Sequence, residues 1–244
     1  MPKDPILFDI LTLFPNFFSG PLSTSLTNKG IHANLIKVGV HDIRDFGSGK
    51  HRQVDDRPFG GGPGMVLKPD VLAKSLKNLV DKRSKLVKSK PHVVLLDAAG
   101  SLLKQEKAQS LAKKSWVILI CGHYEGVDER FKNAFVDEEI SIGDYILTGG
   151  EPAALVVLDS VSRLIPGFLG KKESVTSESF AKVRVENKEL KLLDYPVYTR
   201  PDIFAGRKVP EVLLSGNHQK IGKWRLEKSL EKTKKKRPDL LREG

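Results

Sequence analysis

The spacing of hydrophobic positions predicts alternating strands and helices over residues 5–165. Short apolar or β-branched runs are typical of buried strands, and longer amphipathic stretches are typical of helices. Strands are predicted at residues 6–14, 35–40, 92–96, 116–121 and 136–142. Helices are predicted at residues 17–26, 70–82, 105–114 and 151–164, with a short one from residue 128. This alternation favours an α/β fold with a mostly parallel sheet.

The pattern changes after Pro166. Residues 170–195 are polar and rich in Lys, Glu and Ser, which is typical of a linker or a mobile lid. A short helix is predicted at residues 209–214, and a long basic helix at residues 218–236 with Asn217 as its N-cap. The sequence therefore predicts an α/β domain over residues 1–167, a flexible linker over 168–195 and a basic helical domain over 196–244.

Composition limits the class of protein. The 244 residues are 39% hydrophobic, enough for a core, and no apolar run approaches the ~20 residues that cross a bilayer. Asp4 and Asp9 interrupt any signal-type apolar segment near the N-terminus. Cys121 is the only cysteine, which excludes an internal disulfide and a thiolate zinc cluster. We therefore expect a soluble cytoplasmic protein with no membrane partner and no metal ligand set.

Charge is distributed unevenly along the chain. The net charge is +11, yet residues 116–170 hold three Lys/Arg against nine Asp/Glu, while residues 205–244 hold twelve against five. A basic segment attracts phosphate backbones, although a solvated lysine-rich helix face would have the same composition. An acidic segment suits a neutral or cationic ligand better than a polyphosphate.

Two glycine-bearing loops lie in that acidic segment, at residues 121–126 and 139–151. Glycine permits a positive φ angle and the close approach of main chain to another group. Each loop follows a predicted strand, and ligands of open parallel sheets bind beyond the carboxyl ends of the strands. The loops therefore predict a single pocket built largely from backbone, although a pair of tight turns between core elements would look similar.

A further glycine-rich loop covers residues 51–65. It is not a phosphate-binding P-loop, because no Gly-Lys-Ser/Thr follows, and it lacks the spacing of a dinucleotide-binding fingerprint. Its charged residues, Arg52, Asp55, Asp56 and Arg57, indicate polar recognition, although a flexible glycine turn would look similar.

Five strings together resemble one protein family. They are Val54–Met65, Gly122–Gly126, Ser141–Glu151, Tyr198–Pro201 and Leu213–His218, and they occur in this order over nearly the whole chain. In these strings the chain resembles the bacterial tRNA (guanine-N1)-methyltransferases. The resemblance implies the SPOUT class, with helices on both faces of the sheet, a deep trefoil knot and a small all-helical C-terminal domain. It also implies a homodimer with shared active sites that methylates tRNA at N1 of the guanosine immediately 3′ of the anticodon.

The same resemblance implies S-adenosyl-L-methionine as methyl donor, and its sulfonium cation agrees with an acidic, phosphate-free pocket. Whether Mg²⁺ takes part is not readable from the sequence. The cofactor contacts that the matching motifs imply are Leu96, Gly122, Tyr124, Glu125, Ile142, Gly143, Asp144, Tyr145, Ile146, Leu147, Gly149 and Gly150.

The reaction needs a base and a cation, because N1 of guanine carries a proton and charge shifts to O6 when that proton leaves. The resemblance assigns Arg163 to O6, although an arginine at a helix C-terminus can also simply face the helix dipole. It places the base at Glu178, where the family has aspartate. The extra methylene matters, since a shift of ~1 Å can lower a rate about 10²-fold.

Two more departures from the family's motifs stand out. His123 occupies a position that is usually arginine, and Leu96-Asp97-Ala98-Ala99-Gly100 replaces Leu-Ser-Pro-Gln-Gly, which places Asp97 near the cofactor. The linker is also longer around residues 185–191, which suggests a lid that orders on substrate binding. Two rival functions are a SPOUT enzyme that methylates a ribose 2′-OH and a non-catalytic RNA-binding protein with a degenerate methyltransferase fold.

Overall fold

The structure is a computed structural model that describes residues 4–84, 87–169, 178–185 and 188–241. The chain divides into two compact units, Met1–Gly170 and Lys171–Gly244. The first unit is built on a five-stranded sheet in the order β2-β1-β6-β5-β7, in which every pairing is parallel. The strands are β1 (Ile6–Thr12), β2 (Ile36–Asp42), β5 (His92–Leu102), β6 (Trp116–Cys121) and β7 (Glu138–Ser141). The prediction of an α/β fold with a parallel sheet is confirmed.

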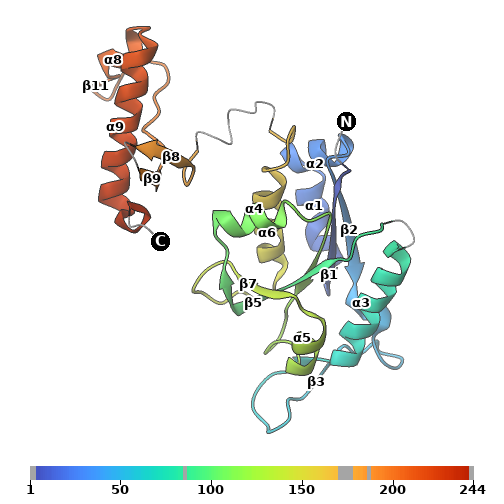
Figure 1. Cartoon of the computed structure of the whole chain (residues 1–244). Coiled ribbons are helices and arrows are strands. Elements are labelled where there is room, and N and C mark those ends of the chain that lie inside the picture. Colours follow the sequence, from blue (N-terminus) through green and yellow to red (C-terminus); the bar gives the residue numbers. More distant parts are fainter. Residues whose placement is uncertain (1–3, 85–86, 170–177, 186–187, 242–244) are drawn as a thin grey trace. The chain divides into compact units, whose positions relative to one another are not determined.

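Helices cover both faces of this sheet (Figure 1). Side chains alternate along a strand, so Phe8 and Ile10 enter one core while Leu7 and Leu11 enter the other. The first core is closed by α1 (Ser19–Leu22), α2 (Ser25–His32), α4 (Gln105–Leu111) and α6 (Glu151–Ser162). The second is closed by α3 (Pro69–Ser84) and α5 (Glu129–Phe135).

The long segment between β2 and α3 contains a 3₁₀ turn, η2 (Ile43–Phe46), and a short antiparallel pair, β3 (Asp55–Asp56) and β4 (Val66–Leu67). A second 3₁₀ turn, η1 (Pro15–Phe18), follows β1. Within the described parts of the chain, none of the helices combines the length and the apolar character that a bilayer crossing requires.

The second unit contains strands as well as helices, so the prediction of an all-helical domain was wrong. β8 (Lys182–Val185) and β9 (Lys188–Lys191) form one antiparallel pair, and β10 (Ile203–Phe204) and β11 (Arg207–Lys208) another. They accompany α8 (Glu211–Leu214), α9 (His218–Lys236) and the 3₁₀ turn η3 (Pro238–Leu241). Lysine or arginine alternates with valine along β8, which is the two-residue period of a strand. The polar composition of residues 170–195 led to the prediction of a linker instead.

Part of the predicted linker is folded. Leu192 is buried, and the backbone N–H of Leu193 donates to Thr233 Oγ1 on α9 at 2.8 Å. The backbone of Phe180 donates to the Leu192 carbonyl at 2.8 Å. Residues 178–185 and 188–194 therefore pack as part of the second unit, where a linker through residue 195 was predicted. Residues 170–177 and 186–187 of that predicted linker, the latter within the proposed lid, lie outside the described residues.

A buried carboxylate ties the sheet to α3. Asp9 on β1 is fully buried and accepts hydrogen bonds from His41 Nε2 at 2.7 Å, Arg83 at 2.8 Å and Trp116 Nε1 at 2.9 Å. Burial opposes ionisation of Asp9, but the hydrogen bonds and charges of His41 and Arg83 outweigh it and lower its pKa. One anion thus joins β2, β1, β6 and α3.

Replacing Asp9 with Asn should destabilise the fold by about 3 kcal/mol at pH 7, because the Arg83 guanidinium loses its buried anionic partner. The pKa of Asp9 is lower in the folded chain than its ordinary value of 3.8, so its stabilisation is present above that value. It is lost as the pH falls through the folded-state pKa. Denaturant unfolding at several pH values measures the difference. Asp45→Asn is the control, since Asp45 and Arg52 are both exposed and such pairs contribute about 0–1 kcal/mol. Equal midpoints for Asp9→Asn and wild type at pH 7 would contradict the assignment.

Candidate active site

A cavity of about 290 Å³ opens at the carboxyl ends of β6, β5 and β7. Its lining comes mainly from residues 96–98 within β5, residues 122–126 after β6, and residues 140–150 at the end of β7 and beyond it. The predicted cofactor residues found in its lining are Leu96, Gly122, Tyr124, Glu125, Ile142, Gly143, Tyr145, Ile146, Leu147, Gly149 and Gly150. Asp144 is exposed and is not part of the lining.

The two glycine loops meet through their main chains. The backbone N–H of Gly150 donates to the carbonyl of Gly122 at 2.9 Å. A side chain at Gly150 would place its Cβ 2.7 Å from Cys121 Cα, inside the backbone of β6. Glycine is therefore required at Gly150 for this approach. Because Gly150 is also the N-cap of α6, the contact places the start of that helix against the end of β6.

The loop after β7 is closed by its own side chains. Ser141 Oγ donates to the Gly143 carbonyl at 3.1 Å, and the Tyr145 hydroxyl donates to the Ile142 carbonyl at 3.0 Å. A Cβ at Gly143 would collide with the ring of Tyr145. Ile146, at the tip, is 85% exposed, so this loop presents apolar surface at the cavity.

The loop after β6 is supported by the third glycine-rich segment. Tyr124 has φ = 61°, a left-handed conformation that is uncommon for a residue with a side chain. The N–H of Glu125 donates to the Met65 carbonyl at 2.9 Å, and the N–H of Leu67 donates to the Gly126 carbonyl at 3.0 Å. Segments that are about 60 residues apart in the chain thus meet at one edge of the cavity, by a strand-like backbone pairing.

A buried acid links this edge to β1. Glu151, the first residue of α6, accepts hydrogen bonds from His123 Nε2 at 2.7 Å and Thr12 Oγ1 at 2.6 Å. Phe14 packs edge-on against the His123 ring, with centroids 5.1 Å apart. Burial opposes ionisation of Glu151, but the bonds from His123 and Thr12 prevail and its pKa is lowered. Sequence reasoning missed Thr12, Phe14 and Glu151; an acid in the first turn of a helix was the available signal for Glu151.

Arg163 lies away from this cavity. It is the C-cap of α6, whereas Gly150, which lines the cavity, is the N-cap. The twelve helical residues between them span about 18 Å at 1.5 Å per residue. The structure does not bring Arg163 to the cavity of its own chain.

Glu178 lies in the second unit. It lines a cavity of about 230 Å³ together with Asp194, Tyr195 and Arg225. Burial raises the pKa of Asp194, the charge of Lys232 opposes this, and the neighbouring Glu178 carboxylate raises it further. The Arg225 guanidinium lies 4.7 Å from the centroid of the Tyr195 ring. Across the parts of the chain that the structure describes, no cluster of three or more His, Cys, Asp or Glu side chains could hold a metal ion.

Comparisons with known proteins cover nearly the whole chain. The family model described as tRNA (Guanine-1)-methyltransferase TrmD matches residues 6–243. The tRNA (guanine-N(1)-)-methyltransferase of Endomicrobium trichonymphae is 48% identical over 238 residues, 96% of this chain and 98% of that protein. The enzyme of the same name from Clostridioides difficile strain 630 is 46% identical over 237 residues, 97% of this chain and 98% of that protein. The chain therefore belongs to the tRNA (guanine-1)-methyltransferase family.

Proposed function

We propose that this enzyme transfers a methyl group from S-adenosyl-L-methionine to N1 of the guanosine immediately 3′ of the anticodon in tRNA. The observation that carries the proposal is the cavity formed by main-chain loops at the carboxyl ends of β6, β5 and β7. The family to which the chain belongs supplies the class of reaction.

The lining of the cavity fits the proposed donor. Among the described residues that form it, none is a lysine or arginine, whereas Glu125 and Asp97 are acidic. A sulfonium cation and a neutral adenine suit such a lining, and a polyphosphate does not. Ile142 and Leu147 offer apolar contacts, and the glycines leave backbone groups accessible. When bound, S-adenosyl-L-methionine supplies an electrophilic methyl carbon.

Two residues of this chain would act on the guanine: one would accept a proton, and the other would stabilise the negative charge that develops. The Glu178 carboxylate would accept the proton from N1, and the Arg163 guanidinium would donate a hydrogen bond to O6, where negative charge develops. Arg163 is about 18 Å along α6 from the start of that helix, which supports a homodimer in which each copy's Arg163 serves the cavity of the other.

The trefoil knot is part of the same proposal. β7 is an edge strand, with β5 between it and β6, yet the chain that leaves β7 returns to the end of β6 at Gly150. This return across β5 supports the knotted crossing that the family resemblance implies.

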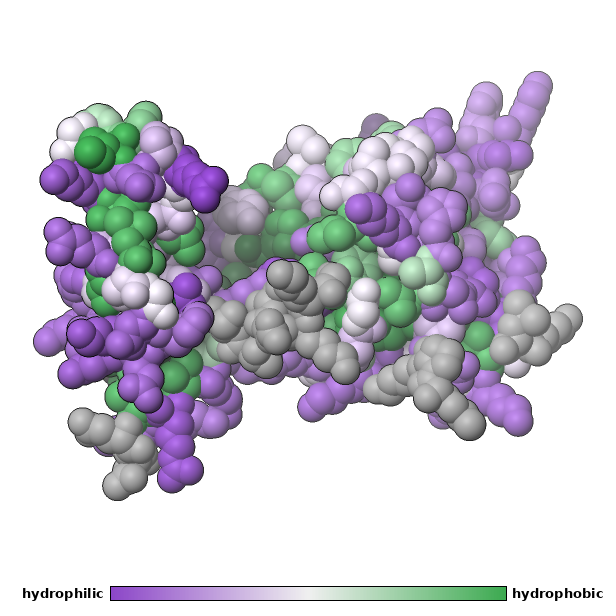
Figure 2. All heavy atoms as spheres, turned by 90° about the horizontal axis from the view of Figure 1, so that it is seen from above, coloured by the Kyte–Doolittle hydropathy of each residue, from purple (hydrophilic) through white to green (hydrophobic). Residues whose placement is uncertain are grey.

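The basic helix α9 is the proposed tRNA contact. Lys234, Lys235 and Lys236 are exposed in its last turn. Figure 2 shows hydrophilic side chains over much of the visible surface of the second unit. Lysine heads that contact phosphates add affinity without reading bases. With tRNA as its substrate, the enzyme would work in the cytoplasm.

Incubation with methyl-labelled donor and unmodified tRNA tests the function as a whole. Nucleoside analysis should give 1-methylguanosine at the position 3′ of the anticodon, because a base and a cation act on N1 and O6. A 2′-O-methylated nucleoside would instead support the ribose-methylating alternative. Binding of tRNA with neither donor binding nor product would support a non-catalytic RNA-binding protein.

Replacing Glu178 with Ala should reduce single-turnover methylation by about 10²- to 10⁴-fold, the usual contribution of a general base. Donor affinity, measured by calorimetry, should not change. Glu178→Asp keeps a carboxylate and serves as the matched control, with activity retained at least in part. Unchanged turnover in Glu178→Ala would show that another group removes the N1 proton.

Reversing charge in α9, with Lys234→Glu and Lys235→Glu together, should weaken binding of any tRNA. The slope of log affinity against log salt should become shallower by about 1 for each lost phosphate contact. Filter binding over a salt series measures both effects. The control is the same reversal at Lys113 and Lys114, which are exposed in the first unit. An unaltered slope in the α9 variant would refute its role.

A further inference from the structure

One wall of the candidate active site is a bulge in β5. Leu96 and Ser101 both pair with Ile140 of β7, so residues 97–100 are extruded between them. Asp97 and Ala98 of this bulge line the cavity. Gly100 closes the bulge, because a Cβ there would lie 2.5 Å from the backbone of Ile140. The position of this wall therefore depends on how the bulge is held.

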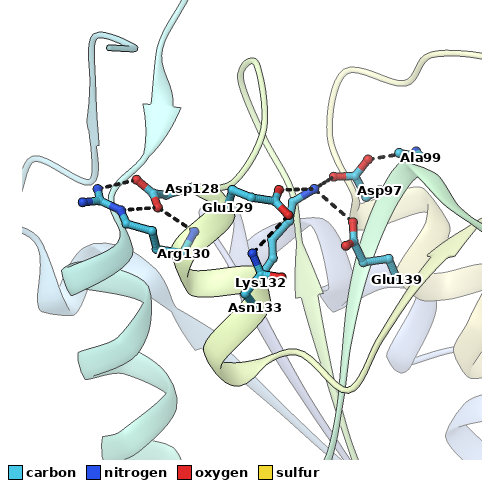
Figure 3. Close-up of polar contacts among 8 residues, drawn as sticks. All are labelled: Asp97, Ala99, Asp128, Glu129, Arg130, Lys132, Asn133 and Glu139. Carbon is cyan, nitrogen blue, oxygen red and sulfur yellow. Dashed lines mark hydrogen bonds and ion pairs between the residues drawn. The ribbon is translucent and has the colours of Figure 1, made fainter.

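A lysine side chain ties the bulge to two neighbouring elements. Lys132 extends from α5, and its Nζ lies 2.9 Å from Asp97 Oδ2 and 3.0 Å from Glu139 Oε2 (Figure 3). Glu129, one turn back on α5, is a weaker partner at 4.0 Å. The Lys132 side chain is only 13% exposed. One ammonium group thus joins α5, the bulge of β5 and the strand β7.

Both carboxylate oxygens of Asp97 accept hydrogen bonds. Its Oδ2 accepts from Lys132, and its Oδ1 accepts from the backbone N–H of Ala99 at 2.9 Å. Burial opposes both charges, but the hydrogen bonds from Ala99 and Lys132 lower the pKa of Asp97, and those to Asp97 and Glu139 raise the pKa of Lys132. Asp97 therefore stays ionised and paired with Lys132 at neutral pH. Its role in the cavity wall is to anchor the β5 bulge.

The bulge has no other strong restraint in its sequence. Asp97-Ala98-Ala99-Gly100 contains no proline, whose ring would fix a φ angle, and its last residue is glycine. Ala98 and Ala99 are exposed. A flexible segment that must present one shape to a ligand binds it less tightly unless that shape is fixed beforehand.

We propose that Lys132 is a positioning residue for the methyl donor: its ammonium, held between Asp97 and Glu139, fixes the β5 bulge against β7 and so preforms one wall of the donor cavity. Lys132 does not line the cavity itself and acts through Asp97. The proposal rests on the proposed function, because it takes this cavity as the donor site.

The first test measures donor affinity by calorimetry on the full chain. Lys132→Met should weaken S-adenosyl-L-methionine binding about tenfold, as expected when a charge-assisted bond that preforms the site is lost. The matched control is Lys107→Met. Lys107 on α4 pairs with Glu138, the residue next to Glu139 on β7, whose side chain points to the opposite face of the sheet. This control loses a similar ion pair away from the cavity and should keep wild-type affinity.

Rescue and kinetics separate positioning from general stability. Lys132→Arg should recover most of the affinity, and Asp97→Asn should weaken binding less in the Lys132→Met background than in wild type. In Lys132→Met the KM for the donor should rise about tenfold, while the KM for tRNA and kcat at saturating donor stay unchanged.

Wild-type affinity in Lys132→Met, or an equal loss in Lys107→Met, would overturn the positioning role and leave the proposed function intact. Additive effects of the Asp97 and Lys132 changes would overturn it as well. Failure of the wild-type chain to bind the donor would instead overturn the proposed function, and this inference with it.

Discussion

The candidate active site depends on the approach of two main-chain segments at Gly150 and Gly122. Their N–H···O bond of 2.9 Å leaves no room for a side chain at Gly150. It brings the segment that follows an edge strand, β7, to the end of β6, two strands away in the sheet. This contact fixes where α6 begins and where the loops on either side of it lie.

Two buried carboxylates stabilise the first unit in different places. Asp9 joins strands and a helix within the sheet, whereas Glu151 joins the start of α6 to His123 and Thr12 at the cavity edge. Both have lowered pKa values because several donors face each of them. Each buried carboxylate connects segments that are distant in the sequence. The connection made by Glu151 lies at the border of the cavity.

Much of the fold could be predicted from the sequence, because it depends on local patterns. The buried strand at 116–121 and the helix at 218–236 have the predicted bounds, since apolar runs and a capping asparagine are local signals. The pairing of Thr12 with Glu151 could not be predicted, because 139 residues separate them and only the folded sheet brings them together. Likewise, family motifs gave Arg163 a role, but only the length of α6 revealed its distance from the cavity.

The packing of the segment around Leu193 and Asp194 against α9 has a consequence for the order of events in catalysis. Glu178 and the exposed lysines of α9 belong to one body, tied by the bonds from Leu193 to Thr233 and from Lys232 to the Asp194 carbonyl. The proposed proton acceptor therefore belongs to the same unit as the proposed tRNA contact, while the proposed donor cavity lies in the other unit. With this division, methyl transfer would wait until bound tRNA brings the Glu178 carboxylate and the guanine to the methyl donor.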